Sequence, residues 1–288
     1  MHTIMDARFA QFPRDLAART RPVRLGKSAQ IPALVAHPDW ENPAPVVLWM
    51  HGRTVNKELD PGRYLRWVRA GIAAVAIDLP GHGERLDAQR QHPSHTLGVI
   101  GEAVGEVDEV FESLANGDWA SLLDFSRAGM GGMSAGGMVT LRRLCDPHPA
   151  VLPGGFKAVA VEGTTGWLEG LYHPERAGLP RADRELIDHP SELITRLDAM
   201  QHMAGITPTP LLALHSESDR IVPWQGMSIF LDRLRAHYRD ENADPGMIEV
   251  RTWPETGAPQ EHSGFGRFAN DAKNAQVEFL ARRLGVTA

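Results

Sequence analysis

Short apolar runs alternate with longer amphipathic segments over most of the chain. Residues 46–50 and residues 72–78, the latter ending in Asp78, are apolar runs of the kind that a parallel strand shows when both of its faces are covered. Between them, a segment with apolar residues at helical spacing begins at Pro61 and ends at Gly71. Strand, helix and strand in this order predict a βαβ unit.

The alternation continues to the C-terminus. Further strands are predicted at residues 157–161, 211–214 and 248–253. Further helices are predicted at residues 99–114, 224–239 and 268–284. Near the N-terminus, two short runs at 23–25 and 31–36 predict a hairpin, preceded by a polar lead-in with a possible short helix at 6–16. The whole pattern predicts an α/β protein with a doubly wound, mostly parallel sheet.

A run of small residues at 128–137 interrupts the pattern between the helix at 99–114 and the strand at 157–161. Within it, Gly132, Ser134 and Gly136 form the sequence G-x-S-x-G, with a short predicted strand before it and a helix after it. In a nucleophile elbow, a serine occupies a sharp strand-to-helix turn, and nearly side-chain-free neighbours let the strand and the helix pack closely. The context therefore favours an elbow over a glycine-rich turn with an incidental serine.

Residues 164–207 do not continue the alternation of strands and helices. They carry many charges among apolar residues, and prolines at 174, 180 and 190 divide them into short helices. Two interpretations stand here: a helical lid inserted above the sheet, or ordinary surface helices covering the sheet edge. We expect one domain over residues 1–288, with 164–207 as the lid insertion.

Composition narrows the possible partners. The chain has 288 residues, 42% of them hydrophobic, and a net charge of −6 spread along the sequence, so no basic face for nucleic acid or anionic lipid is expected. The single cysteine, Cys145, rules out an internal disulfide. The N-terminus is charged where a signal peptide needs an apolar core, and no run approaches the ~20 apolar residues of a membrane span. We expect a cytoplasmic protein that binds a small molecule.

No sequence pattern indicates a metal or an organic cofactor. His92 and His95 are close together, but no third ligand follows at a recognisable spacing. The glycines around Gly129 do not match a dinucleotide-binding pattern, because Ser134 stands where that pattern needs glycine or alanine, and no P-loop sequence occurs. We therefore expect the chain to need no cofactor and no metal.

A serine at an elbow needs a base and an acid, because its hydroxyl is too weak a nucleophile alone. Asp219 follows the predicted strand 211–214, and His262 lies in the loop after the last predicted strand. The chain order Ser134, Asp219, His262 is the order in which hydrolases with this elbow carry their triads. Glu162 and Glu217 are alternative acids in suitable loops, and we prefer Asp219.

With these residues the chain resembles the α/β-hydrolase superfamily from about residue 46 to the C-terminus. Within it, the chain is most similar to the esterase, dienelactone-hydrolase and prolyl-oligopeptidase-type branch, because of the sequence Ser-Asp-Arg-Ile-Val-Pro at 218–223 and the short final loop. The landmarks, in chain order, are His51-Gly52, residues 78–83, Gly132 to Gly136, Asp219 with residues 221–223, and His262.

The resemblance implies further roles near the serine. The backbone amides of Arg53 and Ala135 are expected to form an oxyanion hole, and Asp78 and His82 are expected to be structural. Dienelactone hydrolases usually carry a cysteine nucleophile, so Ser134 does not imply that specific activity. The Arg53 side chain would lie beside the hole and must find an anion, either a protein carboxylate or a part of the substrate.

Together these features predict a serine hydrolase that cleaves carboxylic esters through an acyl-enzyme. A peptidase or amidase with the same triad is the alternative within this class, and a non-catalytic hydrolase-fold ligand-binding protein is the alternative outside it. We expect the substrate pocket to be lined by Met133, Trp167, Trp224 and Phe265.

Overall fold

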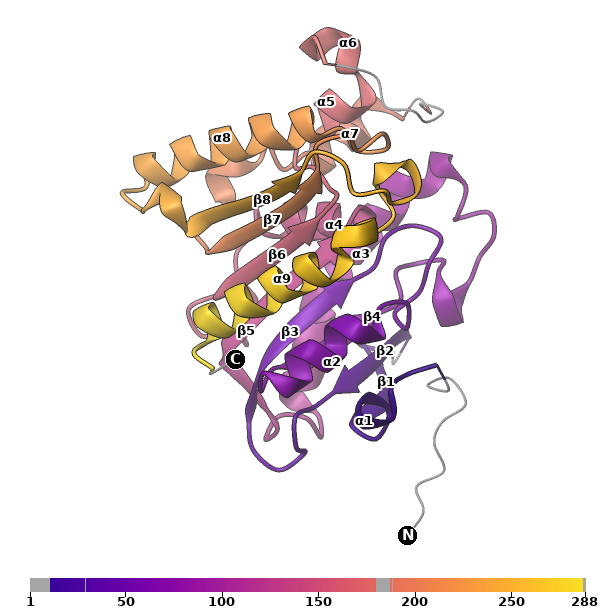
Figure 1. The fold of residues 1–288 in the computed structure, drawn as a ribbon, viewed down its shortest axis with the longest axis vertical. Helices are drawn as coiled ribbons and strands as arrows, with labels where there is room; N and C mark the ends of the chain where they lie inside the picture. Colours follow the sequence, from indigo (N-terminus) through magenta and orange to yellow (C-terminus); the bar gives the residue numbers. More distant parts are fainter. Residues whose placement is uncertain (1–10, 29, 180–186, 188, 287–288) are drawn as a thin grey trace.

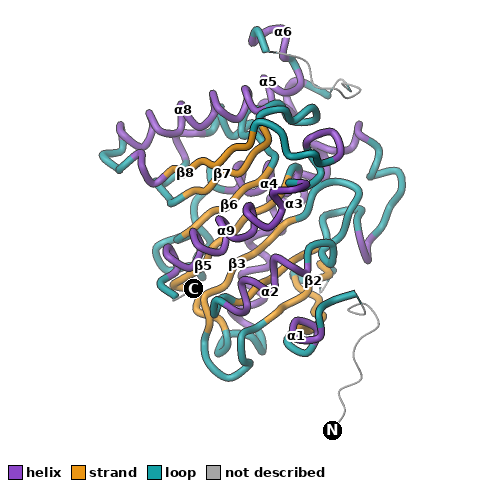
Figure 2. Tube along the Cα trace, in the orientation of Figure 1, coloured by secondary structure: helices purple, strands orange, loops and turns teal. Residues whose placement is uncertain are grey.

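The structure is a computed structural model, and it describes residues 11–28, 30–179, 187 and 189–286. Its centre is an eight-stranded sheet in the order β1-β2-β4-β3-β5-β6-β7-β8, shown in Figures 1 and 2. The strands are β1 (Thr20–Leu25), β2 (Ile31–Ala36), β3 (Ala44–Met50), β4 (Ala73–Ile77), β5 (Leu123–Met133), β6 (Ala158–Glu162), β7 (Leu211–Ser216) and β8 (Ile248–Trp253). The pairs β1·β2 and β2·β4 are antiparallel, and all other pairs are parallel.

Helices cover both faces of this sheet, as Figure 1 shows. The helices are α1 (Arg14–Ala17), α2 (Pro61–Arg69), α3 (Thr96–Asn116), α4 (Ala135–Arg143), α5 (Leu168–Tyr172), α6 (Pro174–Ala177), α7 (Ser191–Leu197), α8 (Trp224–Asp240) and α9 (Ala269–Leu284). Apolar side chains of α1, α2 and α9 form one core, and those of α3, α4, α5, α7 and α8 form the other.

Strand β3 shows why its sequence is a continuous apolar run. Val46, Leu48 and Met50 enter the core shared with α3 and α4, whereas Val47 and Trp49 enter the core shared with α2 and α9. Successive side chains of a strand point to opposite faces, so a strand with helices on both sides needs apolar residues at every position. The predicted doubly wound α/β fold is confirmed.

Most predicted elements are present with shifted ends. The elbow strand β5 extends from Leu123 to Met133 and has a register shift against β3 between Pro45 and Val46. The polar residues near its start were not expected to be part of the strand. Helix α3 begins three residues earlier than predicted, at Thr96. The first half of the helix predicted at 6–16, residues 6–10, lies outside the described part of the chain. In the described part, α1 begins at Arg14.

In the described part of the segment 164–207, the α-helices are α5, α6 and α7. Leu168 and Leu171 of α5 and Ile194 and Leu197 of α7 are buried in the core on the α3 side. Residues 180–186 and 188, including the predicted break at Pro180, lie outside the described residues. None of the helices in the described part of the chain combines the length and apolarity needed to cross a bilayer.

Candidate active site

Ser134 lies at the turn between β5 and α4, with φ 52° and ψ −116°, a conformation that a non-glycine residue rarely adopts. Its two glycine neighbours have no room for a side chain. A Cβ atom on Gly132 would lie 2.4 Å from the Gly136 carbonyl carbon, and one on Gly136 would lie 2.2 Å from the Met50 oxygen. The glycines therefore permit the close strand-to-helix packing that the sequence predicts.

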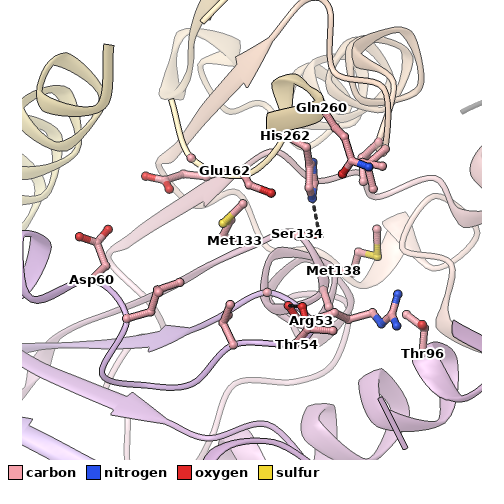
Figure 3. Close-up of a pocket in the computed structure, with 18 of the residues that line it drawn as sticks. Arg53, Thr54, Asp60, Thr96, Met133, Ser134, Met138, Glu162, Gln260 and His262 are labelled. Carbon is pink, nitrogen blue, oxygen red and sulfur yellow. Dashed lines mark hydrogen bonds between the residues drawn. The ribbon is translucent and has the colours of Figure 1, made fainter. Parts of the chain in front are cut away.

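Three side chains from distant parts of the chain form a line of hydrogen bonds at this turn. His262 Nε2 lies 2.9 Å from Ser134 Oγ, as the dashed line in Figure 3 shows, and His262 Nδ1 lies 2.8 Å from Asp219 Oδ2. With Nδ1 protonated and bound to the carboxylate, Nε2 is the acceptor that faces the hydroxyl. The arrangement can therefore take a proton from Ser134 during attack on a carbonyl group.

The other oxygen of Asp219 is fixed by backbone. The amides of Ile221 and Val222 each donate to Oδ1 at 2.8 Å, so the segment 219–222 curls around its own carboxylate. Nε2 of the buried His215 lies 3.5 Å from Asp219 Oδ2 and 2.9 Å from the Val222 carbonyl oxygen. Burial holds the pKa of His215 below its ordinary value, which favours the neutral ring. Asp219 thus faces His262 as an oriented carboxylate.

Neither alternative acid contacts His262 in the structure. Glu162 lies at the end of β6 and forms a bidentate ion pair with buried Arg63, at 2.7 and 2.9 Å. The Arg63 guanidinium also lies over the Trp49 ring, 4.1 Å from its centroid. Glu217 accepts a hydrogen bond from Thr252 Oγ1 at 2.7 Å. These contacts leave Asp219 as the carboxylate at the imidazole.

The loop after β3 approaches the serine from the other side. A Cβ atom on Gly52 would lie only 3.4 Å from Ser134 Cβ, so the backbone that leads to Arg53 passes directly beside Ser134. Ala135 is the first residue of α4, and its amide belongs to the helix N-terminus. The amides of Arg53 and Ala135 thus come from two segments that meet at Ser134, as an oxyanion hole requires.

Buried ion pairs hold this loop. Lys57, 1% exposed, contacts Asp78 and Glu84 at 2.7 Å each and Glu58 at 2.9 Å. Burial alone would lower the pKa of Lys57, but the hydrogen bonds to Asp78 and Glu84 raise it above its ordinary value. The Lys57 amide also donates to Asp78 at 3.0 Å. The Asp78 carboxylate therefore joins the end of β4 to the loop that contains Arg53.

Two buried histidines lie beside this network. His51 accepts a hydrogen bond from the Leu79 amide at 3.0 Å, and burial lowers its pKa to about 4. His82 lies 2.9 Å from the Pro80 carbonyl through Nδ1, and burial also lowers its pKa. The lowered pKa favours the neutral form of each ring, and both rings bond to backbone near Ser134.

A cavity of about 670 Å³ opens at Ser134 and His262. Figure 3 shows Asp60 and Glu162 on one side of these two residues and Arg53, Thr96 and Met138 on the other. Asp60, Arg63, Glu162 and Lys273 form a charged end of the lining, and Tyr172, Ile187 and His189 reach the cavity from the segment 164–207. The Arg53 side chain lines the cavity and donates a hydrogen bond to the Gln91 carbonyl oxygen.

Two of the four expected pocket residues line this cavity. Met133 and Phe265 do, but Trp167 and Trp224 lie elsewhere. Trp167 precedes α5 and covers Gly170, where a Cβ atom would lie 2.6 Å from the indole ring. Trp224 begins α8 and packs against His215, with ring centroids 5.3 Å apart. Trp167 packs on its own helix and Trp224 packs on β7, away from the cavity, so the expectation for these two residues is wrong.

Within the described part of the chain, no three His, Cys, Asp or Glu side chains gather as a metal site would require. The ring of His92 accepts a hydrogen bond from the Ser94 amide and thereby caps a short turn.

A mostly parallel sheet with a serine at the strand-to-helix elbow is the arrangement of the α/β-hydrolases. The chain is a serine hydrolase of this fold. It belongs to the prolyl oligopeptidase family, whose sequence model matches residues 63–287.

The chain is similar to known proteins at two levels. It is 25% identical over 236 residues to YitV of Bacillus subtilis (strain 168), which bears the name "Putative esterase", covering 74% of this chain and 89% of that protein. Its fold matches the Pyrococcus furiosus esterase Pf2001 (TM-score 0.65, 16% identity, 95% and 96% of the two chains). It also matches the Pyrococcus horikoshii acylaminoacyl peptidase (TM-score 0.67, 17% identity, 92% of this chain and 41% of that one).

Proposed function

We propose that the protein hydrolyses carboxylic esters through an acyl-enzyme, with Ser134 as nucleophile, His262 as base and Asp219 as the acid that orients it. The observation that carries this proposal is the hydrogen-bonded line Ser134–His262–Asp219 at the wall of an open cavity. A line of this kind activates a serine because the imidazole accepts its proton as the new bond to the carbonyl carbon forms.

The proposed reaction has two halves, acylation of Ser134 and hydrolysis of the acyl-enzyme. Ser134 Oγ attacks the ester carbonyl carbon while His262 Nε2 takes its proton, and the Arg53 and Ala135 amides stabilise the tetrahedral oxyanion. His262 then returns the proton to the leaving alcohol, and the acyl group remains on Ser134. A water molecule, deprotonated by His262, attacks the acyl carbon, and His262 returns the proton to Ser134 Oγ as the acyl–oxygen bond breaks and the acid leaves. Asp219 stabilises the imidazolium in both halves of the cycle.

The chain is similar in length to the esterases that it matches and much shorter than the peptidase, which favours ester substrates over peptides. The chain covers 89% of YitV and 96% of the Pyrococcus furiosus esterase Pf2001, but 41% of the acylaminoacyl peptidase. The family name and that peptidase match make an amidase or peptidase the second candidate. Both activities use the same three side chains, and they differ in the leaving group that His262 must protonate.

We further propose that the segment 164–207 acts as a lid of a single α/β-hydrolase domain. Its described residues Tyr172, Ile187 and His189 line the cavity. A segment placed there limits the access of water and substrate to Ser134, which is what closing segments of hydrolytic sites do.

The test is a series of aryl esters from acetyl upward, each paired with the anilide of the same acyl group. We expect kcat/KM to be larger for the ester in every pair, and the Ser134→Ala enzyme to lose turnover of both. Anilides cleaved as fast as their esters would assign the protein to the amidases. Binding of the esters without turnover by the parent enzyme would indicate a ligand-binding protein instead.

A further inference from the structure

Glu261, the residue before the proposed base, has a side chain that is tied into the scaffold. Its Oε2 accepts hydrogen bonds from Thr256 N at 2.6 Å, Thr256 Oγ1 at 2.7 Å and Ser216 Oγ at 2.9 Å. Its Oε1 accepts one from Gly257 N at 2.7 Å. Four donors converge on one carboxylate, two of them backbone amides of the loop that carries His262.

The backbone at this position is in an unfavourable conformation. Gln260 has φ 54° and Glu261 has φ 55°, in the left-handed region that favours glycine and that longer side chains rarely adopt. Two such residues in succession persist only where surrounding contacts hold them. The hydrogen bonds of the Glu261 carboxylate are contacts of that kind.

The two left-handed residues set the direction in which three neighbouring side chains point. Gln260 and His262 line the cavity, as Figure 3 shows for both, whereas Glu261 turns to Ser216 and Thr256. Without this turn, His262 could not face Ser134 while its neighbour reaches the end of β7.

The contact with Ser216 also links the base to the acid. Ser216 is the last residue of β7, and its carbonyl oxygen accepts a hydrogen bond from the Asp219 amide at 3.2 Å. A second link joins the same two loops, because the Arg220 amide donates to the Gln260 carbonyl at 3.1 Å. The spacing between His262 and Asp219 therefore depends on bonds made by Gln260 and Glu261.

We infer that Glu261 is a positioning residue: its carboxylate holds the turn at 260–261 so that the His262 ring lies between Asp219 and Ser134. This inference rests on the role proposed above for His262. A displacement of about 1 Å in a catalytic group can lower a rate by about 100-fold, so the alignment of one ring is sufficient to control turnover.

The main test is Glu261→Gln in the full-length protein, with Glu255→Gln as the matched control. Glu255 lies in the same loop with an exposed side chain, so its substitution removes the same charge without these four bonds. A single amide oxygen cannot serve four donors. We expect kcat for an aryl ester to fall by about 10- to 100-fold in Glu261→Gln with KM within about 2-fold, and parental values in Glu255→Gln.

Two further measurements separate alignment from stability. The far-downfield proton resonance of a His262 Nδ1–H bonded to Asp219 should be present in the parent and in Glu255→Gln, and lost in Glu261→Gln. Glu261→Gly removes the carboxylate and also relieves the left-handed strain, because glycine accepts a positive φ. We expect it to lose kcat as Glu261→Gln does, whereas a role in stability alone predicts parental kcat for each folded molecule, which would overturn the inference.

If Glu261→Gln does not fold, Ser216→Ala removes one of the four bonds and should lower kcat by roughly 2- to 10-fold. Parental kcat and an unchanged resonance in that variant would overturn the inference. His262→Ala, measured in the same assay, distinguishes the two proposals. Turnover by His262→Ala would refute the proposed function and this inference together, whereas an inactive His262→Ala beside a fully active Glu261→Gln would refute the inference alone.

Discussion

Two loops bring backbone and side chains to Ser134, and different forces hold them. The loop after β3, which carries Arg53, is fixed by the buried ion pairs of Lys57 with Asp78 and Glu84. The loop after β8, which carries His262, is fixed by hydrogen bonds from neutral groups to Glu261, across a left-handed turn.

The difference matches what each loop must supply. The first loop presents a backbone amide, which needs only a rigid main chain. Buried ion pairs hold a main chain firmly as long as all partners remain, because the loss of one leaves an uncompensated charge. The second loop presents an imidazole between two partners, and directional hydrogen bonds fix such an orientation. We therefore expect changes in the first loop to affect mainly stability and changes in the second to affect mainly rate.

The largest expected effect is the loss of kcat when the carboxylate at His262 is removed. Asp219→Asn should lower kcat by about 10⁴-fold, because the amide favours the wrong imidazole tautomer. Steady-state kinetics with an aryl ester measure this loss. Glu217→Gln, two residues away and bonded to Thr252, is the control and should keep the parental kcat. A loss of that size in Glu162→Gln, with Asp219→Asn nearly silent, would transfer the role of the acid to Glu162.

On the oxyanion side, Lys57→Met should lower the free energy of unfolding by about 3 to 5 kcal/mol, because Asp78 and Glu84 lose their shared buried cation. Urea unfolding monitored by circular dichroism measures the change. Lys27→Met, at an exposed lysine, should change stability by less than about 0.5 kcal/mol. Equal stabilities of the two variants would contradict the view that ion pairs hold this loop.

Acid should weaken the hydrogen bonds that hold the loop after β8. Partial burial disfavours ionisation of Glu261, but the hydrogen bonds from Thr256 and Gly257 lower its pKa from 4.5 to about 2. A carboxyl whose pKa is lower in the folded state stabilises the fold fully above pH 4.5 and loses this contribution as the pH falls toward 2.

The stability difference between the parent and Glu261→Gln should therefore be constant from pH 7 to about 5 and shrink below about pH 4.5. Urea unfolding at a series of pH values measures it. A difference that does not vary with pH would show that the charge of Glu261 does not hold the loop.

The smallest expected effect concerns the Arg53 side chain. Arg53→Ala removes its hydrogen bond to the Gln91 carbonyl and should destabilise the protein by about 0.5 to 1.5 kcal/mol, with similar changes in kcat/KM for neutral and acidic esters. A neutral aryl ester and a dicarboxylate half-ester of equal length provide the comparison. A loss of about 10-fold or more confined to the half-ester would instead assign the guanidinium to an anionic substrate group.

The sequence predicted the elements of the fold because local pattern determines them. Strand β3 is apolar at every position, and Gly132 and Gly136 flank Ser134 at the spacing that an elbow needs. Their positions after predicted strands, together with chain order, favoured Asp219 and His262, and the structure brings these two side chains within 2.8 Å of each other.

The contacts that hold the site could not be predicted in this way. Arg63 and Glu162 are 99 positions apart and meet only because β6 and α2 are brought together by the strand order of the sheet. The hydrogen bonds of Glu261 could not be predicted either, since no sequence pattern indicates a left-handed turn at Gln260 and Glu261. Trp167 and Trp224 were expected at the pocket, yet Trp167 covers Gly170 of α5 and Trp224 packs against His215 of β7.

Ser134 is the proposed nucleophile, and His262 is the residue proposed to activate it. Reaction with a fluorophosphonate, followed by mass spectrometry of the digested protein, tests both parts at once. We predict one label for each chain, on Ser134, with no label in Ser134→Ala and much slower labelling in His262→Ala. A label on another residue, or ester hydrolysis by Ser134→Ala at the parental rate, would show that Ser134 is not the nucleophile.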